Sequence, residues 1–217
     1  MDIIYQDWRI VVVIKPVGVL APDEPGGMPE LLRRELGTEC IRSVHRLDAQ
    51  VSGLMVYARS SAAAGILSEQ IRQGELDKEY LAIVHGEPPE RGDLEDLLRR
   101  DRSLRKTFVA DAPGKNVRPA RLSYEVLDRR EGLSLVRIRL HTGRTHQIRV
   151  QFQSRGWPLW GDGKYSTDGN APIALFSCTL AFRHPEDGKA MRFTAIPPEI
   201  APWDLFSHIL RPQQKKR

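Results

Sequence analysis

A short segment, residues 43–58, combines charged side chains with an apolar run. Arg46 and Asp48 stand two positions apart, and an apolar stretch follows at 54–57. Because burying an ion is costly unless it is paired, a guanidinium and a carboxylate beside a buried strand serve either structure or chemistry. Local physics alone favours a structural role for Arg46 and Asp48. Evidence for a catalytic role has to come from the other motifs of the chain.

Three further segments carry residues that could take part in a reaction. Lys15 follows the apolar run 10–14, where a lysine more often simply surfaces at the end of its strand. Tyr80 shares one face of a predicted strand with Ala82 and Val84, which predicts a buried tyrosine. Arg149 lies in the segment 141–152, which reads as a turn entering a helix.

This set of residues suits acid–base or nucleophilic chemistry on a glycosidic bond without a metal. Glycosidases of the usual kind need two carboxylates flanking the bond, and only Asp162 could join Asp48, so that interpretation is weak. His45 and Asp48 could ligate a metal, but no further ligand cluster supports them. The two cysteines, Cys40 and Cys178, predict neither a disulfide framework nor a zinc site.

Several common catalytic motifs are missing from the sequence. It contains neither G-x-x-x-x-G-K-[ST] nor G-x-G-x-x-G, and it lacks G-x-S-x-G and H-E-x-x-H. The sequence therefore carries no phosphate loop, no dinucleotide fingerprint, no nucleophile elbow and no helical zinc motif.

The distribution of charge points to a polyanionic partner. The net charge is +5, but Arg211, Lys215, Lys216 and Arg217 supply four of these charges. The acidic stretch 87–96 is followed by a basic one, which holds Arg99, Arg100, Arg102, Arg105 and Lys106 and is extended by Lys115, Arg118 and Arg121. Such a stretch suits contacts with phosphates, and a solvated loop would explain it about as well.

The length and composition describe a globular protein. The 217 residues predict a single catalytic domain, 1–210, and a basic, disordered tail, 211–217. No apolar run approaches the roughly 20 residues that cross a membrane, and the acidic N-terminus does not resemble a signal peptide. We therefore expect a cytoplasmic protein that does not bind membranes.

The pattern of strands and helices predicts the fold class. Apolar runs predict strands at 3–5, 10–14, 78–86, 120–127, 133–140, 174–182 and 191–193. Helices are expected at 29–36, from Ser60 or Ser61 to about Gln73, and after residue 142 up to Gly156. The segment 87–119 shows little regular pattern apart from a short strand at 107–109. The order indicates an α+β fold with a mixed, largely antiparallel central sheet and flanking helices. The N-terminus of the third helix, with Gly143 and Arg144, would suit an anion.

Four motifs in this order resemble one known family. His45-Arg46-Leu47-Asp48 with Ser52-Gly53 is similar to the H-R-L-D-x-x-T-S-G signature of the RluA family of pseudouridine synthases. Lys15-Pro16-x-Gly18 and Lys78-Glu79-Tyr80-Leu81-Ala82 resemble the family's K-P-x-G and K-x-Y-x-A elements. The stretch 142–150, with 156–162, resembles its T-G-R-x-H-Q-I-R element.

The resemblance implies an activity and roles for individual residues. Members detach uracil from ribose in RNA, rotate the base and rejoin it through ring carbon five. Asp48 would attack the sugar or remove a ribose proton, Arg149 would pair with it, and Tyr80 would stack on the uracil and serve as base. Arg46 would fill the space left by the flipped nucleotide, while Arg144 and the basic stretch would hold phosphates. Lys15, His45 and His146 are expected to be structural.

One departure from the family and two alternatives remain. Val51 stands where the family usually has threonine, which could alter hydrogen bonding beside Asp48. A non-catalytic module that binds or folds RNA, and an N-glycosidase that releases uracil, are the competing functions. Since the chain starts at the catalytic unit, we expect a compact monomer that recognises a stem-loop of transfer RNA, ribosomal RNA or both.

Overall fold

The computed structural model describes residues 1–167, 169 and 172–211. The fold divides into two compact units: unit 1 comprises Met1–Glu79 and Phe176–Ala195, and unit 2 comprises Tyr80–Leu175 and Ile196–Arg217. The predicted disordered tail lies outside the described residues except for Arg211. The single catalytic domain predicted for 1–210 remains a prediction.

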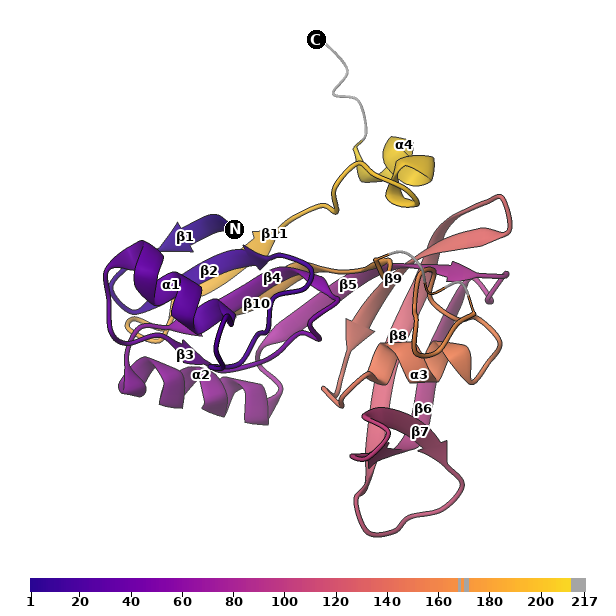
Figure 1. Ribbon diagram of the computed structural model, residues 1–217, viewed down its shortest axis with the longest axis horizontal. Coiled ribbons are helices and arrows are strands. Elements are labelled where there is room, and N and C mark those ends of the chain that lie inside the picture. The colour runs from indigo at the N-terminus through magenta and orange to yellow at the C-terminus, as the bar shows by residue number, and fades with distance from the viewer. Residues whose placement is uncertain (168, 170–171, 212–217) are drawn as a thin grey trace. The chain divides into compact units, whose positions relative to one another are not determined.

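Unit 1 is built on four neighbouring strands in the order β1 (Asp2–Gln6), β2 (Ile10–Lys15), β4 (Ser52–Ala58) and β10 (Leu175–Arg183). Two shorter strands pair at their sides, β3 (Arg42–Ser43) with β4 and β11 (Ala190–Thr194) with β10. All pairs are antiparallel except β10 with β4. The helices α1 (Met28–Leu36) and α2 (Ser61–Gln73) lie against these strands (Figure 1).

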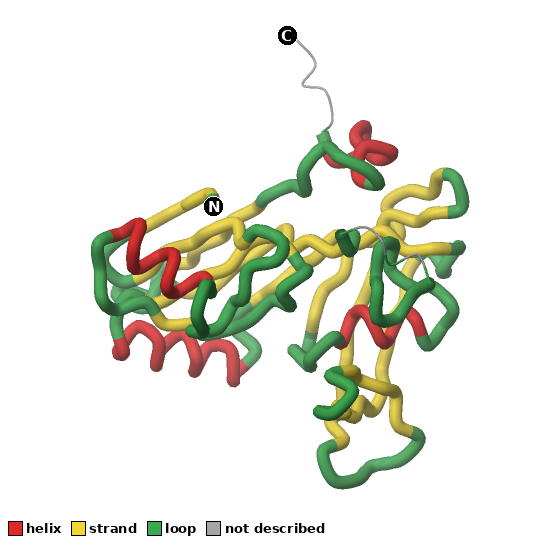
Figure 2. Tube along the Cα trace, viewed as in Figure 1, coloured by secondary structure: helices red, strands yellow, loops and turns green. Residues whose placement is uncertain are grey.

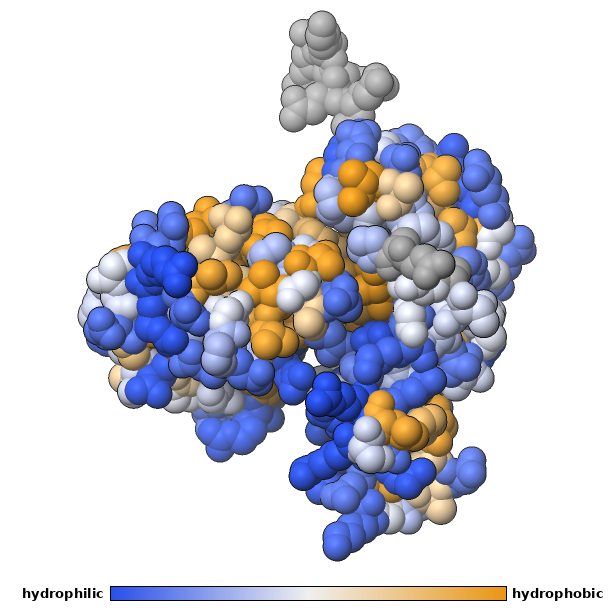
Figure 3. Space-filling model, viewed as in Figure 1, coloured by the Kyte–Doolittle hydropathy of each residue, from blue (hydrophilic) through white to orange (hydrophobic). Residues whose placement is uncertain are grey.

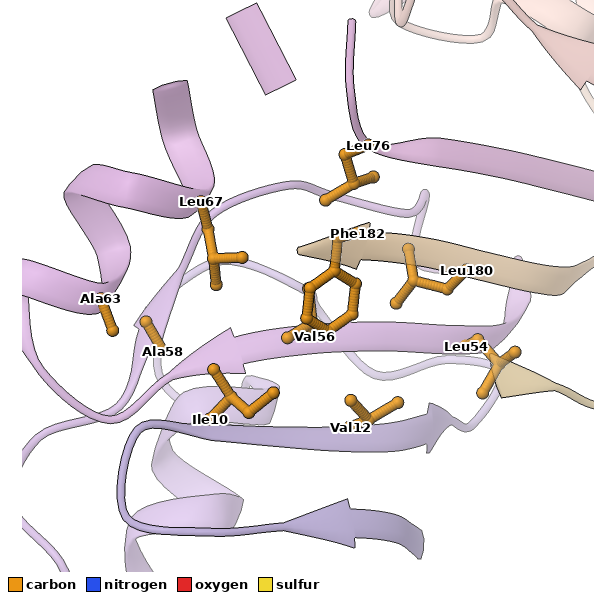
Figure 4. Close-up of a cluster of buried hydrophobic side chains, with 10 residues drawn as sticks. All are labelled: Ile10, Val12, Leu54, Val56, Ala58, Ala63, Leu67, Leu76, Leu180 and Phe182. Atoms are coloured by element: carbon orange, nitrogen blue, oxygen red, sulfur yellow. The ribbon is translucent and has the colours of Figure 1, made fainter. Parts of the chain in front are cut away.

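The ends of α2 follow directly from the sequence. The Ser60 hydroxyl accepts a hydrogen bond from the Ala63 backbone N–H at 3.1 Å, and Gly74 ends the helix in the left-handed conformation, with φ 74°. Ala63 and Leu67 of α2 pack on apolar side chains of β2, β4 and β10 (Figure 4). Alternate residues of these strands fill the cluster, for example Val56 in β4. This core fixes β4, whose N-terminal end carries the Asp48 loop.

Unit 2 contains the remaining strands in the order β5 (Asp77–His85, in this unit from Tyr80), β9 (Leu133–Leu140), β8 (Val117–Arg130), β6 (Arg91–Asp101) and β7 (Lys106–Ala110). Its helices are α3 (Gln147–Gln153), the 3-10 helix η1 (Trp203–Phe206) and α4 (Ser207–Leu210). The pairs of β6 with β7 and β8, and of β8 with β9, are antiparallel. The α+β class with a largely antiparallel mixed arrangement of strands is therefore confirmed.

The strand β6 corrects the prediction of weak regular structure in 87–119. Leu94, Leu97 and Leu98 do not alternate along the chain, and only Leu94 and Leu98 are buried. The strand forms because β8 and β7 lie on either side of it, with Arg91 opposite Glu125 and Asp101 opposite Lys106. Pairing with these two neighbouring strands overrides a poor apolar pattern within β6. Figure 2 shows the loop 111–116 extending beyond the strands β7 and β8 that it joins.

The helix α3 is shorter than expected at both ends. It begins at Gln147, and His146 before it adopts the left-handed conformation, with φ 54°. The backbone N–H of Arg144 donates to the Gln147 side chain at 3.0 Å. The expectation that Gly143 and Arg144 form the N-terminus of this helix is therefore wrong, because both residues precede it and the Arg144 amide already has an acceptor, whereas anion binding by this segment stays a prediction.

Candidate active site

Asp48 lies in unit 1, in the loop between β3 and β4. Its side chain is half-buried, and its carbonyl accepts a hydrogen bond from the Val51 backbone N–H at 3.0 Å, which closes a tight turn. The Val51 side chain is 2% exposed and packs as an apolar residue. The turn is closed by backbone atoms, so it does not need the hydroxyl of the usual threonine.

Gly53, the second residue of β4, allows this strand to pack closely against β10. It has φ 123°, and a Cβ atom there would lie 2.4 Å from the backbone N and O of Ser177. Only glycine allows β4 to approach β10 this closely. The glycine of the motif is thus required by packing directly beside the Asp48 turn.

Lys15 does not surface at the end of β2, which corrects the expectation. Its side chain is fully buried, and its Nζ donates to the carbonyls of Pro16 at 2.8 Å, Val19 at 2.8 Å and Ala49 at 3.1 Å. Burial lowers the pKa of Lys15 to about 8, and the nearby charge of Asp48 opposes that shift. Lys15 therefore ties the loop after β2 to the loop that carries Asp48.

His45 has a structural environment, as expected. Its Nε2 accepts a hydrogen bond from the Val56 backbone N–H at 3.1 Å, which holds the loop against β4. Burial, with a smaller contribution from the charge of Lys78, lowers the pKa of His45 to about 3. The ring is therefore neutral at physiological pH. Arg46, the next residue, is exposed.

Tyr80 and Arg149 both belong to unit 2. Tyr80 lies in β5 and is 4% exposed, so the prediction of a buried tyrosine is confirmed. Arg149 lies in α3 and is 5% exposed. Because Asp48 belongs to unit 1 and the structure describes each unit by itself, the pairing of Arg149 with Asp48 stays a prediction.

Asp162 is a partner of Arg149 that sequence reasoning missed. The Nε of Arg149 donates to Asp162 Oδ2 at 2.8 Å, and its Nη2 donates to Oδ1 at 2.6 Å. Asp162 Oδ1 also accepts the backbone N–H of Lys164 at 3.0 Å. The Asp162 side chain has no exposed surface, so this bidentate pair holds the guanidinium plane in one orientation. Its position directly after the apolar turn 157–161 was the available sequence signal, since a buried carboxylate needs a cation.

Tyr165 contacts Arg149 and the residues around it. Its hydroxyl accepts the Thr107 backbone N–H at 2.7 Å and lies 2.9 Å from His146 Nδ1. The Arg149 guanidinium carbon lies 5.2 Å from the centre of the Tyr165 ring. These contacts join α3 to β7, and they support the structural role expected for His146.

The predicted RNA-binding residues, apart from Arg46, lie in unit 2. Arg99 and Arg100 stand in β6, Arg102 and Arg105 in the hairpin turn, and Lys106 begins β7. The four arginines are exposed, and blue, hydrophilic residues dominate the face of this hairpin and the loop 111–116 in Figure 3, beside a small orange patch.

Two arginines of this region also make internal contacts. Arg100 donates to the Thr145 hydroxyl at 3.2 Å, and Arg144 Nε donates to the Pro119 carbonyl at 2.9 Å. Both side chains are exposed, so they keep surface that RNA could contact.

Two kinds of feature are absent from the described residues. No group of three or more His, Cys, Asp or Glu in this part of the chain is arranged to hold a metal ion. None of its helices is both long enough and apolar enough to cross a membrane.

The site and the sequence together define the class of protein. Residues 9–154 match the family model of RNA pseudouridylate synthases. The chain therefore belongs to the RNA pseudouridylate synthase family, which confirms the resemblance and the predicted enzyme class, an RNA-modifying isomerase.

Individual relatives extend this match over most of the chain. Over 92% of its length the chain is 34% identical to the RNA pseudouridine synthase YlyB of Bacillus subtilis (strain 168), and it spans 70% of that protein. The same share is 34% identical to the ribosomal large subunit pseudouridine synthase D of Neisseria meningitidis serogroup A, of which the chain spans only 59%. The solved structure of human RNA pseudouridylate synthase domain containing 1 has the same fold, with a TM-score of 0.78 at 22% identity over 97% of this chain and 94% of that one.

Proposed function

We propose that this protein isomerises specific uridines of an RNA to pseudouridine. It would break the bond between ribose and the uracil ring nitrogen, rotate the base and rejoin it through ring carbon five. The observation that carries this proposal is the family match over residues 9–154, which includes Asp48, Tyr80 and Arg149. The burial of Tyr80 and Arg149 also supports the proposal. Polar and charged side chains are usually solvated, and buried ones are more often part of a functional site.

Asp48 is the proposed catalytic carboxylate. It either attacks the anomeric carbon of the sugar or removes the neighbouring ribose proton. Arg149 would pair with Asp48, keep it ionised and orient it. Asp162 supports this role, because it holds the Nε and Nη2 side of the guanidinium and so fixes the direction in which the rest of the group points.

Tyr80 would stack on the uracil and remove, directly or through another group, the final proton from ring carbon five. A tyrosine is suited to both tasks, since its ring offers a stacking face and its hydroxyl a proton acceptor once ionised. Its position in the strand β5 supports a fixed stacking platform.

The RNA has to present its target outside the helical stack. A stacked uracil cannot reach a catalytic group, so the nucleotide would flip out, and the contacts in the pocket would offset the lost stacking. Arg46 would fill the vacated space, and Arg144 with the basic hairpin of β6 and β7 would contact phosphates. None of these steps requires a metal or an organic cofactor.

The substrate that we propose to test first is large-subunit ribosomal RNA. One relative is named a ribosomal large subunit pseudouridine synthase, and that name supports the choice. Transfer RNA remains the alternative substrate. A monomer in the cytoplasm, as expected from the sequence, also stays a prediction.

Bulk RNA carrying tritium at carbon five of its uridines tests the proposal. The wild type should release tritium to water without free uracil, and Asp48→Asn should not. Asp2→Asn is a matched control, because Asp2 is an exposed aspartate of the same unit, and it should react like the wild type. Free uracil would indicate an N-glycosidase, and tight binding without release would indicate a non-catalytic RNA-binding module.

A second measurement separates the two roles of Asp48. Deuterium at ribose carbon two of the target uridine should slow the reaction if the carboxylate removes that proton. Attack on the anomeric carbon would leave the rate nearly unchanged, because the bond to deuterium would not break.

A further inference from the structure

An open groove in unit 2 has two lysines in its lining and no acidic residue among the lining residues that the structure describes. It has a volume of about 410 Å³, and its lining includes Lys106, Pro158, Lys164, Tyr165, Ser166 and Thr167. This volume lies within the range of small-ligand sites, so one nucleotide of a larger polymer would fit. The groove runs between the end of α3 and the segment 164–167, and both belong to unit 2.

The two lysines lack the internal counter-charges that many surface lysines have. Lys106 Nζ lies 4.8 Å from the centre of the Tyr165 ring, and Lys164 Nζ donates to the Arg105 carbonyl at 3.2 Å. Among the described residues no carboxylate lies within salt-bridge distance of either amine, and none of the groove's described lining residues is acidic. Within the part of the chain that the structure describes, no carboxylate therefore neutralises this positive charge.

The negative groups that the structure describes near the groove, the Asp162 carboxylate and the carbonyls at the end of α3, already have partners. The buried Asp162 carboxylate is neutralised by Arg149 through two hydrogen bonds. At the end of α3, the Phe152 carbonyl accepts from the N–H groups of Arg155 and Trp157, and the Gln153 carbonyl accepts from Gly156 N–H. These carbonyls at the helix end are therefore occupied and do not repel an anion.

The groove is also held in shape. The Tyr165 hydroxyl is fixed by Thr107 and His146, and the Ser166 backbone N–H donates to the Asp162 carbonyl at 2.8 Å. A preformed site loses little entropy when a charged ligand binds. Lys164 reaches the carbonyl of Arg105, so the groove continues from the basic hairpin of β6 and β7.

We propose that this groove binds a phosphodiester of the substrate RNA through Lys106 and Lys164. The inference rests on the proposed function and adds to it a second phosphate site beside the hairpin. Lys106 was expected to contact RNA, but Lys164 carried no expectation from the sequence. An anionic ligand is favoured because the groove supplies uncompensated cations, and RNA supplies regularly spaced phosphates.

Binding of RNA stem-loops at a series of salt concentrations tests the groove. The probe is the fragment of ribosomal or transfer RNA that the wild type binds most tightly. Lys106→Ala combined with Lys164→Ala should weaken binding roughly tenfold, as expected when a charged hydrogen bond is removed. The slope of log affinity against log salt should fall by about one for each phosphate that the variant no longer binds. Lys189→Ala is the matched control, since Lys189 is an exposed lysine in unit 1, and it should change neither quantity.

A methylphosphonate scan then identifies the contacted phosphate. Replacing one phosphate at a time with a neutral methylphosphonate should weaken wild-type binding at a position where the double variant shows no further loss. Identical scans for the two proteins, or an unchanged salt slope, would overturn the inference. Circular dichroism has to show that the double variant is folded, and each single variant provides the same test if it is not.

The salt series and the scan measure RNA binding and not catalysis. The proposed phosphate site and the proposed reaction can therefore be refuted independently. If the wild type binds RNA without releasing tritium, the proposed function fails and the scan still decides the groove. If the wild type releases tritium and the scans are identical, only the groove is overturned.

Discussion

Two buried cations of this protein are stabilised in different ways. In unit 1, Lys15 is surrounded by three neutral carbonyl groups, whereas in unit 2 Arg149 is paired with a buried carboxylate, Asp162. Carbonyl dipoles offset only part of the cost of burying a charge, so the pKa of Lys15 falls to about 8. A guanidinium with a bidentate carboxylate stays charged and points in one direction.

The difference suggests distinct tasks for the two cations. Lys15 connects backbone segments, because its amine reaches both the loop after its own strand and the loop that carries Asp48. Arg149 is a fixed charge that the bidentate pair with Asp162 holds in one orientation. Variants at these positions should therefore differ in the size of their effect and in their pH dependence.

The largest effect is expected from Asp162→Asn. It leaves the Arg149 guanidinium buried without its counter-charge, which should lower the free energy of unfolding by about 3 kcal/mol or more and abolish tritium release. Urea unfolding and the tritium assay measure both. Glu125→Gln is the control: the Glu125–Arg137 pair spans 2.9 Å but is largely exposed, so it should cost less than about 1 kcal/mol. Equal losses in the two variants would contradict the contrast.

A smaller effect is expected from Lys15→Met. The carbonyls of Pro16, Val19 and Ala49 lose their donor, which should lower the free energy of unfolding by roughly 1–3 kcal/mol. The loop holding Asp48 loosens, so kcat should fall more than KM changes. Lys189→Met, an exposed lysine of the same unit, should do neither. A variant with wild-type stability and kcat would show that the three hydrogen bonds do not position Asp48.

The pH dependence of stability should carry the signature of Lys15. Its pKa is about 8 in the folded protein and 10.5 in the unfolded chain, so the unfolded state binds more protons between these values. The contribution of Lys15 to stability should therefore rise as the pH rises from about 8 to 10.5. Denaturant unfolding over this range should show the rise in the wild type and not in Lys15→Met. Parallel curves for the two proteins would mean that the Lys15 amine is not desolvated.

The smallest effect on activity is expected from Val51→Thr. The turn at Asp48 is closed by the Val51 backbone N–H, so restoring the hydroxyl should change kcat less than about twofold. The buried hydroxyl should cost on the order of 1 kcal/mol of stability. Thermal unfolding and the tritium assay measure the two quantities. A large gain in kcat would indicate that a hydroxyl at this position acts on Asp48 directly.

Much of the frame could be predicted because its signals are local. The N-cap at Ser60, the end of α2 at Gly74 and the buried face of β5 with Tyr80 all follow from short patterns. The strand β6 was not predicted, since its leucines do not alternate and its regular structure comes from pairing with the two strands that follow it, β7 and β8. The burial of Lys15 was missed for a related reason, because two of its acceptors, at Val19 and Ala49, lie in loops whose path is set by packing.

The sequence by itself determined the order of the motifs, the α+β class and the family, because these depend on residue types at fixed local spacings. The tertiary structure alone decided which groups meet. It placed Asp162 on Arg149, thirteen positions along the chain, and Lys106 and Lys164 on one groove. Contacts between residues far apart in sequence depend on the packed fold, and no local pattern encodes them.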